Sequence, residues 1–147
     1  GDTFELGGIT IQTYACPGHT LGSMIFLIRE DDGETYLLTG DACNTFTFLF
    51  QEYSTSIEEY EETLRKVAEQ LKGKYTKVLL SHGDGNGYVG ILKDVCNVCE
   101  EIKTGKAEGL PFEFSGATGK IAHVPAPDKG NIVYNDDRIW KKDTVIR

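Results

Sequence analysis

Residues 17–28 have the sequence Pro-Gly-His-Thr-Leu-Gly-Ser-Met-Ile-Phe-Leu-Ile (PGHTLGSMIFLI), a turn followed at once by an apolar run. Pro17 fixes its own φ and Gly18 is conformationally free, so the backbone shapes this turn and leaves His19 little packing to do. His19 is one of only three histidines in the chain. A histidine displayed in this way is typical of one used for its ring nitrogens. Residues 24–28 predict a strand covered on both faces.

Strand patterns lie on both sides of this stretch. Residues 9–14 alternate between apolar and polar side chains, which predicts a half-buried strand, and a shorter strand precedes it before a Gly-Gly turn at residues 7–8. Residues 35–39 return as a partner strand after a turn at residues 31–33. The opening of the chain is therefore predicted to be a β-meander.

Helical patterns follow the meander. Ser56 and Glu59 form a capping box at the start of a helix over residues 57–71, which Gly73 closes. A short buried strand is predicted at residues 78–80. A second helix then runs from residue 88 to residue 103, with inward residues at helical spacing.

The rest of the chain carries weaker signals. Residues 132–140 predict a terminal hairpin, whereas residues 106–129 form a Gly/Pro-rich connection with no assigned structure. The order of elements predicts an α/β (α+β) fold, with a mixed β-sheet and helices packed on one face. Because 147 residues fit one domain, residues 1–147 are taken as a single domain with no second one.

Composition restricts the partners and the compartment. The formal charge is −8, from 15 Lys and Arg against 23 Asp and Glu, and no basic run or apolar run of membrane-spanning length is present. Nucleic-acid and membrane partners are therefore not expected. Of the four cysteines, Cys96 and Cys99 are predicted to be two half-buried thiols on one helix face, and reduced cysteines in a cytoplasmic protein are the expectation.

Two other side chains share the setting of His19. Asp41 follows the strand at residues 35–39, and His82 follows the strand at residues 78–80. Strands that run in the same direction end at one edge of a sheet, so His19, Asp41 and His82 are expected to converge there. Imidazole and carboxylate groups suit Zn²⁺, Mn²⁺ or Fe²⁺. His123 lacks a strand-end setting and is interpreted as an ordinary surface residue.

Three motifs, PGHTLGSMIFLI, LLTGDA and VLLSHG, occur in this order over residues 4–103. Together they resemble the later half of the metallo-β-lactamase-fold hydrolases. The resemblance implies half of an αββα sandwich with two metals at one edge. It makes His19 a ligand of the first metal, Asp41 the bridging ligand and His82 a ligand of the second metal. Because Asp rather than Cys holds the bridging position, the sequence is more similar to the glyoxalase II-like branch.

The resemblance also implies an activity. Such enzymes hydrolyse small-molecule esters or thioesters with hydroxide held on two divalent metals, zinc first, with iron or manganese as alternatives. The His-x-His-x-Asp-His motif of the family's earlier half has no match here. We therefore expect this chain to be the C-terminal part of a longer protein, whose missing N-terminal half supplies the other ligands and a proton-handling Asp. Asn44 and Tyr88 follow the strands and are expected to contact substrate, although packing is the stronger expectation for Tyr88.

Two consequences are expected for the isolated chain. Metal binding should be weak and hydrolysis negligible, because catalytic zinc normally has three protein ligands. Copies should self-associate through the apolar sheet face that includes residues 24–28. Two alternatives stay open: a mononuclear two-His-one-carboxylate site formed by His19, Asp41 and His82, and a non-catalytic interaction module of the same fold.

Overall fold

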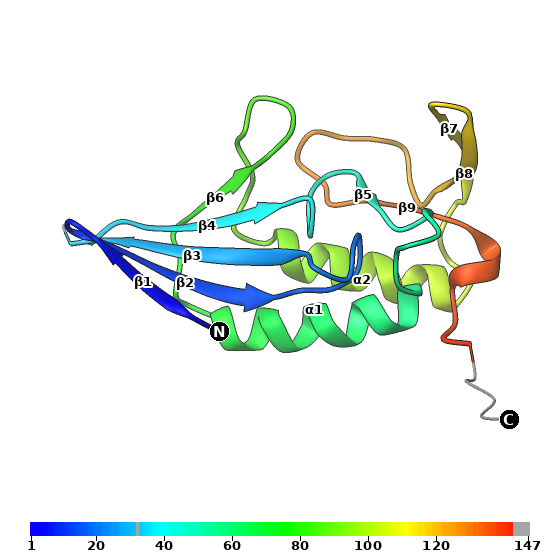
Figure 1. Ribbon diagram of the computed structural model, residues 1–147. Helices are drawn as coiled ribbons and strands as arrows, with labels where there is room; N and C mark the ends of the chain where they lie inside the picture. Colours follow the sequence, from blue (N-terminus) through cyan, green and yellow to red (C-terminus); the bar gives the residue numbers. More distant parts are fainter. Residues whose placement is uncertain (32, 143–147) are drawn as a thin grey trace, which may run out of the picture.

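The computed structural model describes residues 1–31 and 33–142 of the chain. Two mixed sheets and two α-helices make up the fold, and Figure 1 shows both helices beneath the larger sheet. The predicted α+β class, with helices on one face of a mixed sheet, is confirmed. In chain order the elements are β1 (Thr3–Leu6), β2 (Ile9–Ala15), β3 (Met24–Glu30), β4 (Thr35–Gly40), β5 (Thr47–Phe48), α1 (Ile57–Leu71), β6 (Lys77–Leu80), α2 (Ile91–Lys103), β7 (Leu110–Phe114), β8 (Ala117–Ile121), β9 (Ile132–Tyr134) and the 3₁₀ turn η1 (Asp136–Arg138).

The larger sheet has the strand order β1-β2-β3-β4-β6. Strands β1 to β4 are antiparallel neighbours, whereas β4 and β6 are parallel. Strands β2, β4 and β6 therefore run in the same direction, and their carboxyl ends lie at one edge of the sheet. The predicted turn between β3 and β4 includes Asp32, which lies outside the described residues.

The two helices cover one face of this sheet. The capping box is present as expected: the Ser56 hydroxyl accepts from the Glu59 amide, and the Glu59 carboxylate accepts from the Ser56 amide. Helix α2 begins at Ile91 rather than at residue 88, because Tyr88 lies in the turn before it. No helix in the described part of the chain is both long and apolar enough to cross a membrane.

The opposite face of the larger sheet carries no helix in the part of the chain that the structure describes (Figure 1). In β3, Ile25 and Leu27 are buried against the helices, whereas Met24 on the other face is 38% exposed. The expectation that β3 is covered on both faces is therefore wrong for the described residues. We call this surface the outer face; by strand register its apolar residues include Phe4, Leu6, Ile9, Ile11, Met24, Phe26, Ile28, Tyr36 and Leu38.

The smaller sheet was not predicted from sequence. Its strand order is β5-β9-β8-β7, with β5 parallel to β9 and the other pairs antiparallel. The expected terminal hairpin is wrong, because β9 pairs with β5 and β8 and is followed by η1. Strands β7 and β8 form a hairpin within the unassigned connection. Its two-residue turn has positive φ at Ser115 and Gly116, at 51° and 84°.

All four cysteines are free and buried. Cys96 and Cys99 were expected to be half-buried, but only 2% and 0% of their surfaces are exposed because both face the core between the helices and the sheet. Burial raises the pKa of the Cys96 thiol to about 11. These thiols are therefore neutral components of the core.

Candidate metal centre and its cavity

A cavity of about 380 Å³ lies where β2, β4 and β6 end. His19 comes from the turn after β2, Asp41 directly follows β4, and His82 follows β6. The fold thus brings together the three side chains that the sequence singled out. The residues that line the cavity are His19, Asp41, Asn44, Thr45, Phe46, Phe48, His82 and Phe114.

The His19 ring is oriented by a backbone carbonyl. Its Nδ1 lies 2.7 Å from the carbonyl oxygen of Phe48 in β5. A carbonyl oxygen only accepts, so Nδ1 carries the proton and Nε2 carries the lone pair of the neutral ring. Histidines that bind metals commonly donate their second N–H to a carbonyl in this way. This tautomer of His19 leaves Nε2 available to bind a metal.

The turn that carries His19 is held by the segment before α1. The Ser54 hydroxyl donates to the His19 carbonyl at 2.8 Å, and the Thr55 amide donates to the Gly18 carbonyl at 2.9 Å. The Tyr53 ring packs edge-on against the imidazole, with ring centroids 6.3 Å apart. The position of His19 is thus set from outside its own turn.

Asp41 and His82 contact each other directly. His82 Nε2 and Asp41 Oδ1 are 2.5 Å apart, and the two side chains are 68% and 50% exposed. Gly40 and Gly83, beside them, have φ of 54° and 65°, which L-residues rarely adopt. Both turns therefore depend on glycine to present a polar side chain at the sheet edge.

Tyr60 in α1 contacts both of the turns that follow β2 and β4. Its hydroxyl donates to the Ala42 carbonyl at 2.6 Å, and its ring lies so close to Gly18 that a Cβ there would be 2.2 Å from Tyr60 Cδ2. Tyr60 is completely buried, and burial raises the pKa of its hydroxyl well above the usual value, so the hydroxyl stays a donor. Sequence analysis missed this role because an aromatic residue at helical spacing indicates only a core position.

Three phenylalanines form the apolar side of the cavity. We call Phe46, Phe48 and Phe114 the phenylalanine wall; they come from the β4–β5 loop, from β5 and from the end of β7. Sequence analysis did not identify them. The alternation of Phe46, Phe48 and Phe50 was visible in the sequence, but Phe114 lies in the connection that had no assigned structure.

The two expected substrate residues are separated by the fold. Asn44 lines the cavity, but its Oδ1 accepts from the Phe46 amide at 2.5 Å, so it shapes the loop. Tyr88 does not line the cavity. Its hydroxyl donates to Asp94 at 2.9 Å and accepts from the Gly130 amide at 2.6 Å, and this confines it to packing between α2 and the β8–β9 connection.

His123 lies outside the cavity. It was interpreted as an ordinary surface residue, and its side chain is 32% exposed. One ring nitrogen contacts the Glu101 carboxylate, and Nδ1 lies 3.3 Å from Glu108 Oε2. The chain thus has two histidines at the cavity and a third in a separate ion-pair network.

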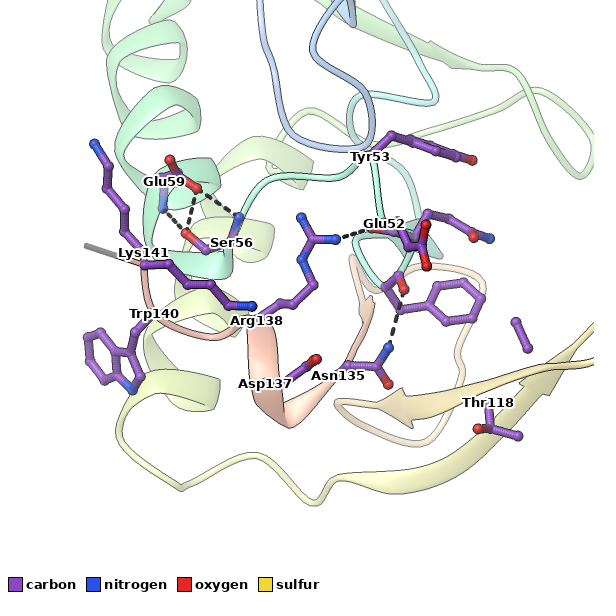
Figure 2. Close-up of a pocket in the computed structure, with 14 residues that line it drawn as sticks. Glu52, Tyr53, Ser56, Glu59, Thr118, Asn135, Asp137, Arg138, Trp140 and Lys141 are labelled. Carbon is purple, nitrogen blue, oxygen red and sulfur yellow. Dashed lines mark hydrogen bonds between the residues drawn. The ribbon is translucent and has the colours of Figure 1, made fainter. Parts of the chain in front are cut away.

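A larger cavity of about 870 Å³ lies between the segment before α1 and the region around η1 (Figure 2). Several of its polar side chains hydrogen-bond to the backbone. Glu59 and Ser56 complete the capping box, and Arg138 donates to two carbonyls, those of Gln51 and Ser54. The described residues that line this cavity include no histidine, in contrast to the cavity that contains His19 and His82.

The sequence matches no protein-family model and no curated protein. Among solved structures, the chain is similar to the protein of "Kinetic and Structural Characterization of the First B3 Metallo-beta-Lactamase with an Active Site Glutamic Acid", with 16% identity and a TM-score of 0.49. The match covers 72% of this chain and 44% of that one, so the chain spans less than half the length of that enzyme. The function proposed below rests on this chain's own residues.

The donor groups at the cavity suit a divalent transition metal. Two imidazoles and a carboxylate are the ligand types of Zn²⁺, Mn²⁺ and Fe²⁺, and the tautomer of His19 leaves Nε2 available. Within residues 1–31 and 33–142, however, no group of three or more His, Cys, Asp or Glu side chains is placed to hold one ion. The three residues therefore fit a metal centre as individual ligands, and they do not form a complete site for one ion.

Proposed function

We propose that this cavity is the metal site of a hydrolase of the metallo-β-lactamase type, with His19, Asp41 and His82 as ligands. The observation that carries the proposal is the hydrogen bond from His19 Nδ1 to the Phe48 carbonyl. It leaves Nε2 as the donor atom beside a carboxylate and a second imidazole. Bound divalent cations, zinc first, with iron or manganese as alternatives, would acidify water and polarise the carbonyl of an ester or thioester.

The chain's own residues have separate tasks in this proposal. His19 and His82 would each contribute one nitrogen, and Asp41 would contribute a carboxylate between them. The Phe48 carbonyl holds the His19 tautomer, and Tyr60 keeps the turns after β2 and β4 at a fixed separation. An Asp rather than a Cys at position 41 is the feature that favours a glyoxalase II-like thioesterase over other branches.

The ligand count supports a further partner. Catalytic zinc usually has three protein ligands, and two ions cannot both be held by two imidazoles and one carboxylate. We propose that the remaining ligands come from an N-terminal half of the same protein, which would also cover the outer face. Without it, copies of this chain would associate through the outer face. A cytoplasmic location is also part of the proposal, supported by the four free thiols.

A non-catalytic module of the same fold is the second candidate. The observation that favours it is that no three-residue metal group exists among the described residues. The two candidates differ in whether His19 and His82 respond to a metal.

The test is a zinc titration of the full chain followed by NMR of its three imidazoles. We expect signals of His19 and His82 to shift together at millimolar Zn²⁺ or below, whereas His123 serves as an internal reference and does not shift. Asp41→Asn should weaken the response, and Asp84→Asn, a matched change outside the cavity, should not. A response of His123 alone, or of none of the three, would overturn the proposal and favour the module.

A further inference from the structure

The cavity has two chemically different sides. Its polar side holds His19, Asp41 and His82, and its apolar side is the phenylalanine wall. Phe46 and Phe114 are 37% and 52% exposed, so their rings have apolar surface that a ligand could cover. Among the described residues, the rest of the lining is uncharged and consists of Asn44, Thr45 and the phenylalanine wall.

The centre of the phenylalanine wall is rigid. The Phe48 ring makes edge-on contacts with Phe114, Phe50 and Phe112, with centroid separations of 5.2, 5.3 and 5.7 Å. Such contacts favour this orientation of the ring. The Phe46 backbone is held by its hydrogen bond to the Asn44 side chain. This side of the cavity is therefore preformed.

One residue joins the two sides. Phe48 contributes its ring to the phenylalanine wall, and its carbonyl accepts the hydrogen bond that orients His19. The distance between the His19 imidazole and the apolar surface is thus fixed through a single residue of β5. A ligand held by the phenylalanine wall would keep a constant position relative to the polar side.

We propose that the phenylalanine wall is a subsite for a small, uncharged aromatic or branched aliphatic group next to the bond that is cleaved. This inference rests on the proposed function and names its substrate class: esters or thioesters of arylalkanoic or branched-chain acids. The volume of about 380 Å³ lies near the lower end of small-molecule pockets, which favours a single ring over a long chain. The described lining residues include no Lys or Arg that could pair with an anionic acyl part.

The test uses neutral probes that do not depend on a metal. Phenylacetamide and acetamide are titrated separately into the full chain without zinc, and the aromatic signals of the three phenylalanines are followed by NMR. We expect phenylacetamide to shift these signals and to bind at least about tenfold more tightly than acetamide, because burial of the ring supplies the difference. Equal binding of the two amides would overturn the inference.

Two matched variants test whether phenylacetamide binds in this cavity. Phe114→Ala should weaken phenylacetamide binding about fivefold. Phe4→Ala makes the same change at a residue that is also 52% exposed but lies on β1, so binding should be unchanged. Equal loss in both variants would contradict the subsite. Because the zinc titration is separate, binding of phenylacetamide without a zinc response would refute the proposed function and the ester substrate class. The phenylalanine wall would then stand only as a binding site for an uncharged aromatic group.

Discussion

The Nδ1 atom of His19 donates to the carbonyl oxygen of Phe48, at 2.7 Å, across 29 residues of sequence. This contact joins the turn after β2 to the smaller sheet. It fixes which imidazole nitrogen faces the cavity, and it depends on the backbone of Phe48 rather than on its side chain.

The first prediction concerns the protonation of His19. In the neutral ring we expect the Nδ1–H tautomer at His19, because the Phe48 carbonyl accepts its proton. Long-range ¹H–¹⁵N NMR distinguishes the two ring nitrogens. A proton on Nε2 instead would contradict the geometry described here and would remove the donor atom from the proposed metal site.

The second prediction concerns Tyr60. Tyr60→Phe removes the donor to the Ala42 carbonyl and leaves that buried oxygen unpaired, so we expect the free energy of unfolding to fall by about 1–3 kcal/mol. Urea denaturation measures the change. Tyr75→Phe is the control, since its hydroxyl also donates to a carbonyl, that of Val89, but in an exposed position. Equal losses of unfolding free energy in the two variants would show that burial does not increase the contribution of the Tyr60 hydrogen bond to stability.

The third prediction concerns Gly18. A Cβ there would lie 2.2 Å from the Tyr60 ring, whereas nothing lies within 4 Å of a Cβ at Gly22. We expect Gly18→Ala to destabilise the fold by about 1–3 kcal/mol through overpacking. Gly22→Ala should change stability by less than about 0.5 kcal/mol. Thermal unfolding of the two variants compares them, and a neutral Gly18→Ala would mean that the turn and α1 are not in tight contact.

The fourth prediction concerns two buried threonines. The Thr39 hydroxyl is buried without a hydrogen-bond partner among the described residues, whereas Thr47 Oγ1 accepts from the Asn44 amide. We expect Thr39→Val to stabilise the fold by about 1 kcal/mol and Thr47→Val to destabilise it by a similar amount or more. Chemical denaturation of both gives the sign of each change. Destabilisation by Thr39→Val would indicate a partner for its hydroxyl.

The fifth prediction concerns Glu61, which joins α1 to α2. Burial opposes its charge, but hydrogen bonds from Lys103 and Arg65 outweigh burial and lower the pKa of Glu61 below its usual value. Because the pKa of Glu61 is lower in the folded state, its charge stabilises the fold at pH values above the unfolded-state pKa of about 4.5. This stabilisation is lost as the pH falls through the lower pKa of the folded state. Glu61→Gln should therefore be less stable than the wild type near pH 6, with the difference narrowing toward pH 3.

The control for Glu61 lies one residue further along the helix. Glu62 pairs with Lys66, and their side chains are 71% and 73% exposed. Exposed pairs contribute little, so Glu62→Gln should follow the wild-type dependence of stability on pH. Parallel curves of unfolding free energy against pH for Glu61→Gln and the wild type would show that Glu61 does not cause the predicted pH dependence of stability.

Local signals explain which elements of the fold could be predicted. Alternation in β2, the capping box of α1 and the glycine after it depend on neighbouring residues alone. The pairing of Thr47 with Ile132 joins distant segments, and β5 is only two residues long, so no periodicity marks it. The β7–β8 hairpin did carry a signal, the Ser115-Gly116 pair, because positive φ at both turn residues favours such dipeptides.

The candidate site was predictable to the extent that it depends on strand direction. His19, Asp41 and His82 each follow a strand, and strands that share a direction end at one edge. The phenylalanine wall and the role of Tyr60 could not be derived, because both depend on how elements outside the larger sheet pack against it. A buried Tyr looks the same in sequence whether or not its hydroxyl holds a neighbouring turn.

The parallel pairing of β4 with β6 has a consequence for the order of folding. Asp41 and His82 are 41 residues apart, and they meet only after the crossover through α1 has closed. Closure of so long a segment is slow compared with formation of the β1–β4 meander. The contact between Asp41 and His82 is therefore expected to form late in folding. A nascent chain that ends before β6 would contain His19 and Asp41 but not His82.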